Sequence, residues 1–157
     1  MKGNRNLAGE QDALTSLVLE VFRFNGALIA AGDDLVADLG LTSARWQVLG
    51  AIALAPAAET VARLARSMGL HRQGVQRIVN ELEKDGIVAF APNPNHRRAN
   101  LVVLTERGKA IYEAASNLQA PWVNRLSDGL NLKGIAIATE VVGELRERLE
   151  RELGDDP

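Results

Sequence analysis

Residues 60–104 read TVARLARSMGLHRQGVQRIVNELEKDGIVAFAPNPNHRRANLVVL and carry the strongest structural signal in the chain. In their first half, apolar residues recur every three or four positions, which predicts two short amphipathic helices separated by a turn at Gly69. Their second half contains two β-type runs, 87–91 and 101–104, joined by the nine residues 92–100. The order helix, turn, helix and hairpin predicts a winged helix-turn-helix.

The helix from about His71 to Gly86 turns a polar face outward. Its apolar residues, from Val75 to Leu82, recur at helical spacing and predict the buried side. In a major groove, arginine forks onto guanine O6 and N7, whereas glutamine and asparagine pair with adenine N6 and N7. The outward residues are therefore candidates for contact with DNA: Arg72, Gln73, Gln76, Arg77 and Asn80.

Four residues of this helix also have interpretations other than contact with bases. Arg72 and Arg77 are consistent with ordinary solvated charges. His71 fits a metal ligand or a pH switch, but we expect it at the N-cap, where it bonds a backbone amide or a phosphate. Gly74 either lets the helix backbone approach a duplex closely or is a tolerated weak position.

The loop between the two β-type runs is longer than most hairpin loops, which have about 2–5 residues, and such loops are usually functional or disordered. Pro92 and Pro94 stiffen it and argue against disorder. Around its tip, His96, Arg97 and Arg98 predict contact with DNA. We expect one arginine to turn inward as a brace and the other to enter a minor groove, the plainer alternative being an ion pair with a carboxylate. Metal binding by the histidine is disfavoured, because no His, Asp or Glu lies near it in the sequence.

The net charge of −2 hides a basic segment. Residues 60–100 contain 7 Lys/Arg and 3 Asp/Glu, a net charge of +4, whereas residues 1–59 and 101–157 each carry −3. Because electrostatic fields are screened within about 8–10 Å at cellular salt, this segment predicts a local site for a polyanion. The chain has no cysteine, which excludes disulfides and thiolate metal sites. It also has no uninterrupted run of ~18 apolar residues, so we expect a cytoplasmic protein without a membrane span.

The flanking segments predict further helices. Apolar residues from Leu14 to Leu39 recur at spacings of three, four and seven, which favours one long helix over 11–39 that stops at a glycine. Gly26 and Gly32 lie inside it and alternatively divide it in two. Beyond the hairpin we expect a helix over about 105–128, kinked by Pro121, and another over about 131–153. The expected N-caps of the remaining helices are Thr42, Thr60, Thr105 and Asn131.

Together these elements predict a mainly α fold with a small β-hairpin wing. Residues 41–104 form the winged helix-turn-helix DNA-binding domain. The segments 11–40 and 105–153 form a helical dimerisation region, because their apolar stripes are too extensive for a monomer to leave exposed.

Three segments resemble the MarR family of bacterial transcription regulators: LTSARWQVLGAI at 41–52, VARLARSMGLHRQGVQRIVNELEKDGIV at 61–88 and NPNHRRANLVVLTERG at 93–108. The resemblance extends over about residues 11–153 and is most specific in the wing and in the pattern LT..G that follows it. His96 stands where the family commonly has an aspartate before its paired arginines. His71 replaces a commoner serine.

The resemblance implies a homodimer that binds a palindromic operator in double-stranded DNA and is often released by a small aromatic or anionic effector. The effector is expected near Trp46, with Arg23 or Arg45 as its anion partner, although a plain core role is the simpler interpretation of the tryptophan. No cofactor is expected.

We therefore expect a sequence-specific DNA-binding regulator that acts as a ligand-responsive repressor, with a constitutive or activating regulator as the alternative. A winged-helix module that binds protein or RNA without operator specificity is the rival class. An enzyme is disfavoured, because the chain has no Walker loop, no G-x-S-x-G, no H-E-x-x-H and no cluster of catalytic carboxylates.

Overall fold

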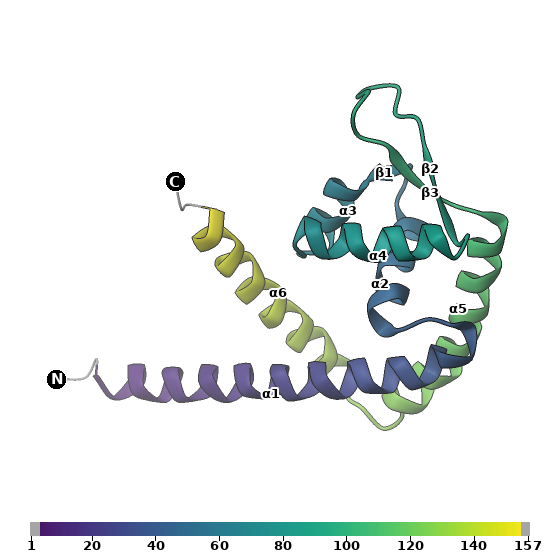
Figure 1. The fold of residues 1–157 in the computed structure, drawn as a ribbon. Helices are drawn as coiled ribbons and strands as arrows, with labels where there is room; N and C mark the ends of the chain where they lie inside the picture. Colours follow the sequence, from purple (N-terminus) through teal and green to yellow (C-terminus); the bar gives the residue numbers. More distant parts are fainter. Residues whose placement is uncertain (1–3, 155–157) are drawn as a thin grey trace. The chain divides into compact units, whose positions relative to one another are not determined.

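A computed structural model describes residues 4–154 of the 157-residue chain. The chain divides into two compact units, Met1–Gln119 and Ala120–Pro157, and the strands all lie in the first. The elements in chain order are α1 (Asn4–Val36), the 3-10 turn η1 (Ala37–Leu39), α2 (Ser43–Leu54), β1 (Glu59–Thr60), α3 (Val61–Ser67), α4 (Arg72–Lys84), β2 (Val88–Ala91), β3 (Leu101–Leu104), α5 (Glu106–Ser127) and α6 (Leu132–Gly154) (Figure 1).

The N-terminal segment is one helix, α1, which continues through Gly26 and Gly32 without a break. It begins at Asn4, earlier than the sequence pattern predicts, and continues into the 3-10 turn η1. Gly40 then adopts a φ of 69°, a left-handed conformation that glycine reaches without steric cost. The predicted single helix with a glycine stop is therefore confirmed.

Two hydrogen bonds made by Ser43 join the start of α2 to the C-terminal part of α1. Its hydroxyl donates to the Ile29 carbonyl at 2.7 Å, and its backbone N–H donates to Asp33 Oδ1 at 2.6 Å. Ser43 is only 4% exposed, so these bonds satisfy polar groups that have little access to water. A Cβ at Gly32 would lie 2.5 Å from the Ser43 hydroxyl oxygen, so glycine is what lets the helices approach this closely.

We expect Gly32→Ala to be less stable than Gly26→Ala, although alanine is the better helix former at both positions. A Cβ at Gly26 meets nothing within 4 Å, so that variant should gain up to ~1 kcal/mol of unfolding free energy. At Gly32 the new methyl displaces the Ser43 hydroxyl from its bond, at a cost of about 1–3 kcal/mol. Urea unfolding measures both variants. Adding Gly32→Ala to Ser43→Ala should then cost little, and equal stability of the two glycine-to-alanine variants would contradict the explanation.

The predicted N-caps are confirmed. The hydroxyls of three threonines accept the backbone N–H three residues further on, and such caps are each worth about 1 kcal/mol. Asn131 Oδ1 accepts the Lys133 N–H at 3.0 Å at the start of α6. The Thr42 hydroxyl accepts the Arg45 N–H at 3.3 Å, the Thr60 hydroxyl accepts the Arg63 N–H at 3.4 Å, and the Thr105 hydroxyl accepts the Gly108 N–H at 3.0 Å.

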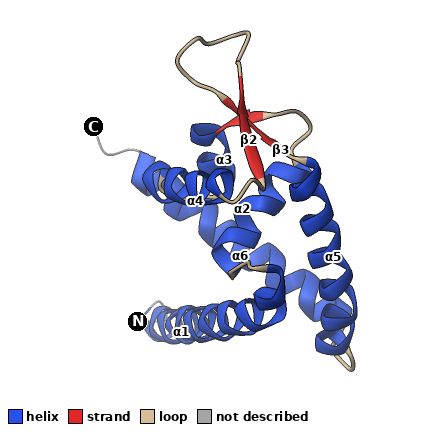
Figure 2. Ribbon diagram, turned by 45° about the vertical axis from the view of Figure 1, so that its right-hand side comes forward, coloured by secondary structure: helices blue, strands red, loops and turns tan. Residues whose placement is uncertain are grey.

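The wing belongs to a three-stranded antiparallel sheet in the order β1-β3-β2 (Figure 2). β2 and β3 pair from Val88 with Leu104 to Ala91 with Leu101, which confirms the predicted hairpin. β1 was not predicted, because two residues are too few to show a strand pattern. Its Thr60 pairs with Leu101 and also caps α3, so the start of α3 is tied directly to the wing.

The core of the first unit lies between α2, α3, α4 and the sheet. Most apolar side chains that these three helices turn inward are buried, whereas Trp46 and Met68 are half-buried against the core. The largest fully buried side chains come from α1, α2, α3, α4 and both wing strands: Val36, Val48, Leu49, Leu64, Val75, Val79, Leu82, Val88 and Val102.

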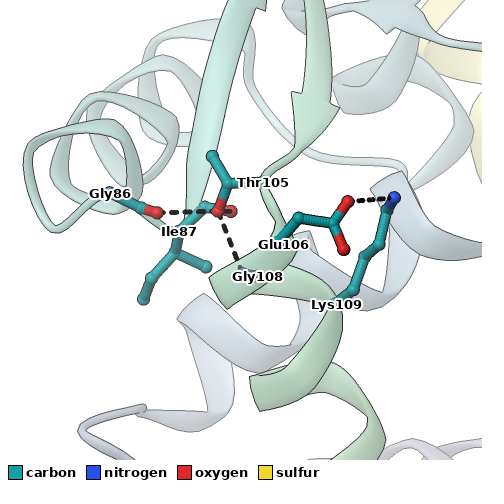
Figure 3. Close-up of polar contacts among 6 residues, drawn as sticks. All are labelled: Gly86, Ile87, Thr105, Glu106, Gly108 and Lys109. Carbon is teal, nitrogen blue, oxygen red and sulfur yellow. Dashed lines mark hydrogen bonds and ion pairs between the residues drawn. The ribbon is translucent and has the colours of Figure 1, made fainter.

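The start of α5 packs against the turn between α4 and β2 (Figure 3). The Thr105 hydroxyl lies 2.7 Å from the Gly86 carbonyl oxygen and 3.0 Å from that of Ile87, and it accepts the Gly108 N–H. The Thr105 N–H donates to the Ile87 carbonyl at 3.1 Å. A Cβ at Gly108 would overlap that same carbonyl oxygen. The pattern LT..G thus combines a helix cap with a close backbone contact.

The second unit contains the end of α5 and all of α6. Pro121 lies inside α5, and the kink predicted there stays a prediction. The outer face of α6 is laced with exposed ion pairs, including Arg146 with Glu150 at 2.7 Å and Arg148 with Glu144. The division into a DNA-binding domain and a dimerisation region stays a prediction.

Both α1 and α6 leave apolar side chains uncovered within the single chain. α1 includes an 18-residue stretch with a mean hydropathy of 1.4, which is long and apolar enough to cross a membrane by length and composition alone, and 0% of that stretch is buried. This qualifies the expectation from the sequence, which considered only uninterrupted apolar runs. Exposed apolar residues include Leu14, Val18, Val21, Phe22 and Phe24 in α1, and Ile135, Ile137, Val142 and Leu149 in α6.

Candidate nucleic-acid interface

α4 has a buried apolar side and an accessible polar side. It packs against α2, α3 and β2 through residues from Val75 to Leu82, as the sequence predicts. Because this side is fixed to the core, the opposite side is presented on a rigid helix. The five residues predicted to contact DNA all lie on the accessible side, Gln76 half-buried and Arg72, Gln73, Arg77 and Asn80 exposed.

His71 occupies the N-cap of α4, as predicted, but its side chain makes no capping hydrogen bond. The expectation that it bonds a backbone amide is therefore wrong. The imidazole is exposed, and contact with a phosphate stays a prediction. Within residues 4–154, no group of three or more His, Asp or Glu side chains is placed to hold a metal ion.

Two pairs of side chains interact along the outer face of α4, and the two residues of each pair lie one helical turn apart. Gln76 Nε2 donates to Asn80 Oδ1 at 2.9 Å. An Arg77 terminal nitrogen lies 3.6 Å from a Glu81 carboxylate oxygen, and both side chains are well exposed. Exposed ion pairs of this kind contribute only about 0–1 kcal/mol, so Arg77 can exchange its partner for a DNA group at little cost.

Arg72, Gln76 and Asn80 also line a groove of about 250 Å³ that α4 shares with α3 and the wing. Its other walls are residues 60–62 at the start of α3 and residues 98–100 in the wing loop. Segments that are far apart in the sequence thus form one polar surface, with the loop projecting beyond the sheet (Figure 2). A duplex held against this surface would meet the helix and the wing together.

The wing loop is shaped by short-range hydrogen bonds. Asn93 Oδ1 accepts the Asn95 N–H at 2.9 Å, and the Asn93 carbonyl accepts the His96 N–H at 3.3 Å. His96 Nδ1 accepts the Arg98 N–H at 3.3 Å, and the His96 carbonyl accepts the Ala99 N–H at 3.2 Å. Asn93 therefore supplies a turn. His96 supplies the side-chain acceptor that an aspartate often provides in such turns.

Arg97 and Arg98 are both exposed, and neither guanidinium pairs with any residue in the described part of the chain. The expectation that one of them turns inward as a brace is wrong, because the bonds within the tip are made by the backbone, Asn93 and His96. The two arginines still differ. Arg98 lines the groove shared with α4, whereas Arg97 does not.

Three further residues belong to this surface and were missed by the sequence analysis. Lys84 lines the hollow along α4 together with Arg77 and Asn80. It lies four residues after Asn80, so helical spacing alone could have identified it. Thr60 and Asn100 both line the groove. They meet only because β1 pairs with β3, and no local sequence pattern indicates that pairing.

The residues expected to contact an effector have different surroundings. Arg45 forms an ion pair with Asp85, donates to the Gly40 carbonyl at 2.9 Å and is 16% exposed, so its charge already joins α2 to the end of α4. Arg23 is 74% exposed and lies 3.4 Å from Glu20 on the preceding turn of α1. Trp46 packs against the core, in agreement with its simpler interpretation. Effector contact by these residues stays a prediction.

Comparison with known proteins places this geometry among transcription regulators. A sequence model described as MarR family matches residues 39–99. The chain is 38% identical over 120 residues to the uncharacterized protein Rv2011c of Mycobacterium tuberculosis, covering 76% of this chain and 82% of that protein. It is 32% identical over 99 residues to the transcriptional activatory protein BadR of Rhodopseudomonas palustris, covering 62% and 57%.

Two crystal structures share the fold. A MarR family transcription regulator superposes with a TM-score of 0.78 at 22% identity, covering 96% of this chain and 99% of that one. A mutant of E. coli MarR complexed with operator DNA superposes with a TM-score of 0.76 at 24% identity, covering 85% and 96%.

Proposed function

The chain belongs to the MarR family of transcription regulators, and we propose that it binds double-stranded DNA at specific sequences to control transcription. The groove between α4 and the wing carries this proposal, because it places Arg72 and Gln76 beside Arg98. A helix of this kind enters a major groove and reads base edges. A wing arginine adds contacts to phosphates or to the minor groove, which contribute affinity and orientation.

The binding unit we propose is a homodimer on a palindromic operator. In support, Phe22 and Phe24 of α1 are 69% and 61% exposed, and α6 exposes a further apolar stripe. Apolar side chains left uncovered to this extent on a helix usually mark an interaction site. In the proposed dimer, α1, α5 and α6 of two copies interleave, and a two-fold axis sets the recognition helices about 34–36 Å apart, one turn of DNA.

Sedimentation equilibrium tests the dimer. At micromolar concentration the protein should sediment at twice its chain mass of 16.9 kDa. Phe22→Glu combined with Phe24→Glu should shift it towards the monomer, because each subunit would then bury unpaired charge. A monomeric wild-type protein at these concentrations would overturn this part of the proposal.

A subunit contact accounts for the apolar surface of α1 better than a membrane span does. Glu20 and Arg23 lie near the middle of α1 and are 69% and 74% exposed. Ionised side chains at the centre of a bilayer cost at least about 2.5–3.5 kcal/mol each. At a helix–helix interface the same two side chains can stay at the edge of the contact, exposed to solvent. We therefore place the protein in the cytoplasm, where chromosomal DNA is accessible.

The regulation we propose is repression relieved by a small aromatic or anionic ligand, bound near Trp46 with Arg23 or Arg45 as its anion partner. The support is the family's general behaviour and the position of Trp46 at the edge of the core. A panel of aromatic acids should change both operator affinity and tryptophan fluorescence. A promoter reporter distinguishes repression from activation, the role named for BadR.

Operator selection from a random duplex pool tests the central proposal. The protein should enrich a palindrome and bind it at least about 10³-fold more tightly than a scrambled duplex. Arg72→Ala combined with Gln76→Ala should abolish most of this preference. Arg125→Ala, which removes one exposed charge from the second unit, is the matched control and should retain it. Equal binding of both duplexes by the wild-type protein would favour a protein- or RNA-binding module instead.

A further inference from the structure

Phe90 is an exposed aromatic residue in the groove between α4 and the wing. Its side chain is 37% exposed, and it lines that groove together with Arg72, Gln76 and Arg98. Of the large apolar side chains that are exposed within residues 4–154, Phe90 alone lines the groove. Apolar residues scattered singly over a surface need no explanation. Phe90 needs one, because it lies within the surface that is proposed to bind DNA.

The position of Phe90 in the hairpin explains why its ring lies there. Side chains two positions apart on a strand lie on the same face of a sheet, so Phe90 shares the face of Val88, which is 2% exposed in the core. Its pairing partner on β3 is Val102, which is 1% exposed. Residues paired across two strands also share a face. The apolar face of the sheet thus continues from the core into the groove, where the ring of Phe90 stays partly uncovered.

The charges around Phe90 indicate what can cover its ring. In the described part of the chain, the residues that line the groove include two arginines, Arg72 and Arg98, and no Asp or Glu. An apolar protein segment laid over the groove would bury both guanidinium groups without partners, which is costly. Double-stranded DNA supplies phosphates for the arginines. It also supplies apolar groups for the ring, namely sugar carbons and the thymine methyl group.

The place of Phe90 between the helix and the wing loop favours the sugar. When a helix lies in the major groove and an attached arm reaches the adjacent minor groove, one sugar–phosphate strand runs between them. β2 connects the end of α4 to the wing loop, so Phe90 would face that strand rather than the base edges. We infer that the Phe90 ring packs against a deoxyribose of the backbone strand that lies between α4 and the wing loop. This inference rests on the proposed DNA-binding function and adds a contact that carries affinity but no sequence information.

Truncation of the ring tests the contact. Phe90→Ala should weaken binding to the selected operator by roughly tenfold, because a dimer would lose the burial of two rings. The loss should be the same when each base pair of the operator is replaced in turn. The slope of log K against log salt should keep its wild-type value, because no phosphate loses its partner. Leu54→Ala is the matched control and should bind as the wild type does, since Leu54 is 76% exposed at the end of α2 and lies outside the groove.

Three further measurements separate a direct contact from other roles of the ring. Phe90→Ala combined with Arg98→Ala should lower the affinity by the product of the two single effects, because the two side chains would contact different groups on the DNA. Phe90→Leu keeps an apolar side chain of intermediate size, so it should stay folded in thermal melting and lose only about threefold in affinity. Deoxyuracil in place of the operator's thymines removes their methyl groups and should leave the ratio between wild type and Phe90→Ala unchanged.

Wild-type affinity in every folded Phe90 variant would overturn the inference. A loss confined to one T·A pair, and absent with deoxyuracil, would show that the ring contacts a thymine methyl group instead. A double variant that binds no more weakly than Arg98→Ala, or a lower salt slope in Phe90→Ala, would show that the ring only positions the wing. A wild-type protein without any operator preference would contradict the proposed function itself, whereas the other outcomes concern a selective protein in which only the contact of Phe90 is absent.

Discussion

Gly108→Ala is expected to lower the free energy of unfolding by about 1–3 kcal/mol or more, the typical penalty for forcing atoms into a packed site. The new Cβ would overlap the Ile87 carbonyl oxygen, and backbone on both sides limits relaxation. Moving α5 away would also lengthen the bonds that join Thr105 to Gly86 and Ile87. Urea unfolding measures the decrease, with near-UV circular dichroism reporting whether the packing around Tyr112, at the edge of the core, is retained.

Gly74→Ala is the matched control for this prediction. It places the same methyl group in a helix, but no heavy atom lies within 4 Å of the new Cβ. Alanine is the better helix former by up to ~1 kcal/mol, so this variant should be at least as stable as the wild type. A similar decrease in both variants would show that the close approach at Gly108 is not the cause. A loss of operator binding in Gly74→Ala, with stability intact, would support close approach of the α4 backbone to DNA.

The helices and their ends were predictable because their causes are local. Threonine at positions 42, 60 and 105 caps the following turn, and Gly40, Gly69, Gly86 and Gly129 each adopt a φ of 65° to 73° where a helix was expected to stop. Capping and left-handed glycines depend on residues within one turn of the chain. The inward face of α4 follows from the same short-range periodicity.

The parts that were missed depend on contacts between distant segments. β1 exists because residues 59–60 meet β3 more than forty positions later, and two residues show no pattern of their own. Arg45 looked like a free cation, but Asp85 and Gly40 occupy its guanidinium. Asp85 follows the C-terminal end of α4, where an acidic side chain is disfavoured by the helix dipole. Its pairing with Arg45 offsets that penalty, and only the folded chain shows it.

The candidate DNA surface was predictable from the sequence only in part. Helical spacing identified five residues of α4, but not which of them bond to each other or share a groove with the wing. Adjacent arginines at positions 97 and 98 are equivalent in the sequence, whereas the folded loop places only Arg98 in the groove. That difference between neighbours of identical chemistry allows a controlled test of the wing.

Arg98→Ala is expected to weaken operator binding by about 1.5–3 kcal/mol per subunit, the range for hydrogen bonds to charged groups, and Arg97→Ala by less. Both variants remove the same charge from the same loop, so nonspecific attraction to DNA falls equally in each. Of the two, only Arg98 lies in the groove shared with α4, so its replacement should remove an interaction whose position is fixed relative to that helix. Titrations of the operator and of a scrambled duplex, at several salt concentrations, measure the two effects separately.

The salt dependence shows what Arg98 binds. If it binds a phosphate, the slope of log K against log salt should fall by about 0.9 for each phosphate that is no longer neutralised, on operator and scrambled duplex alike. If Arg98 instead enters a narrow minor groove, the decrease in affinity should be larger when A·T-rich flanks adjoin the operator, because such tracts carry the stronger negative potential. Arg97→Ala is the charge-matched reference in both cases. Identical titrations for the two variants would mean that the groove does not distinguish the arginines. Binding equal to wild type for both, at every salt concentration, would mean that residues 92–100 are not a DNA-binding wing.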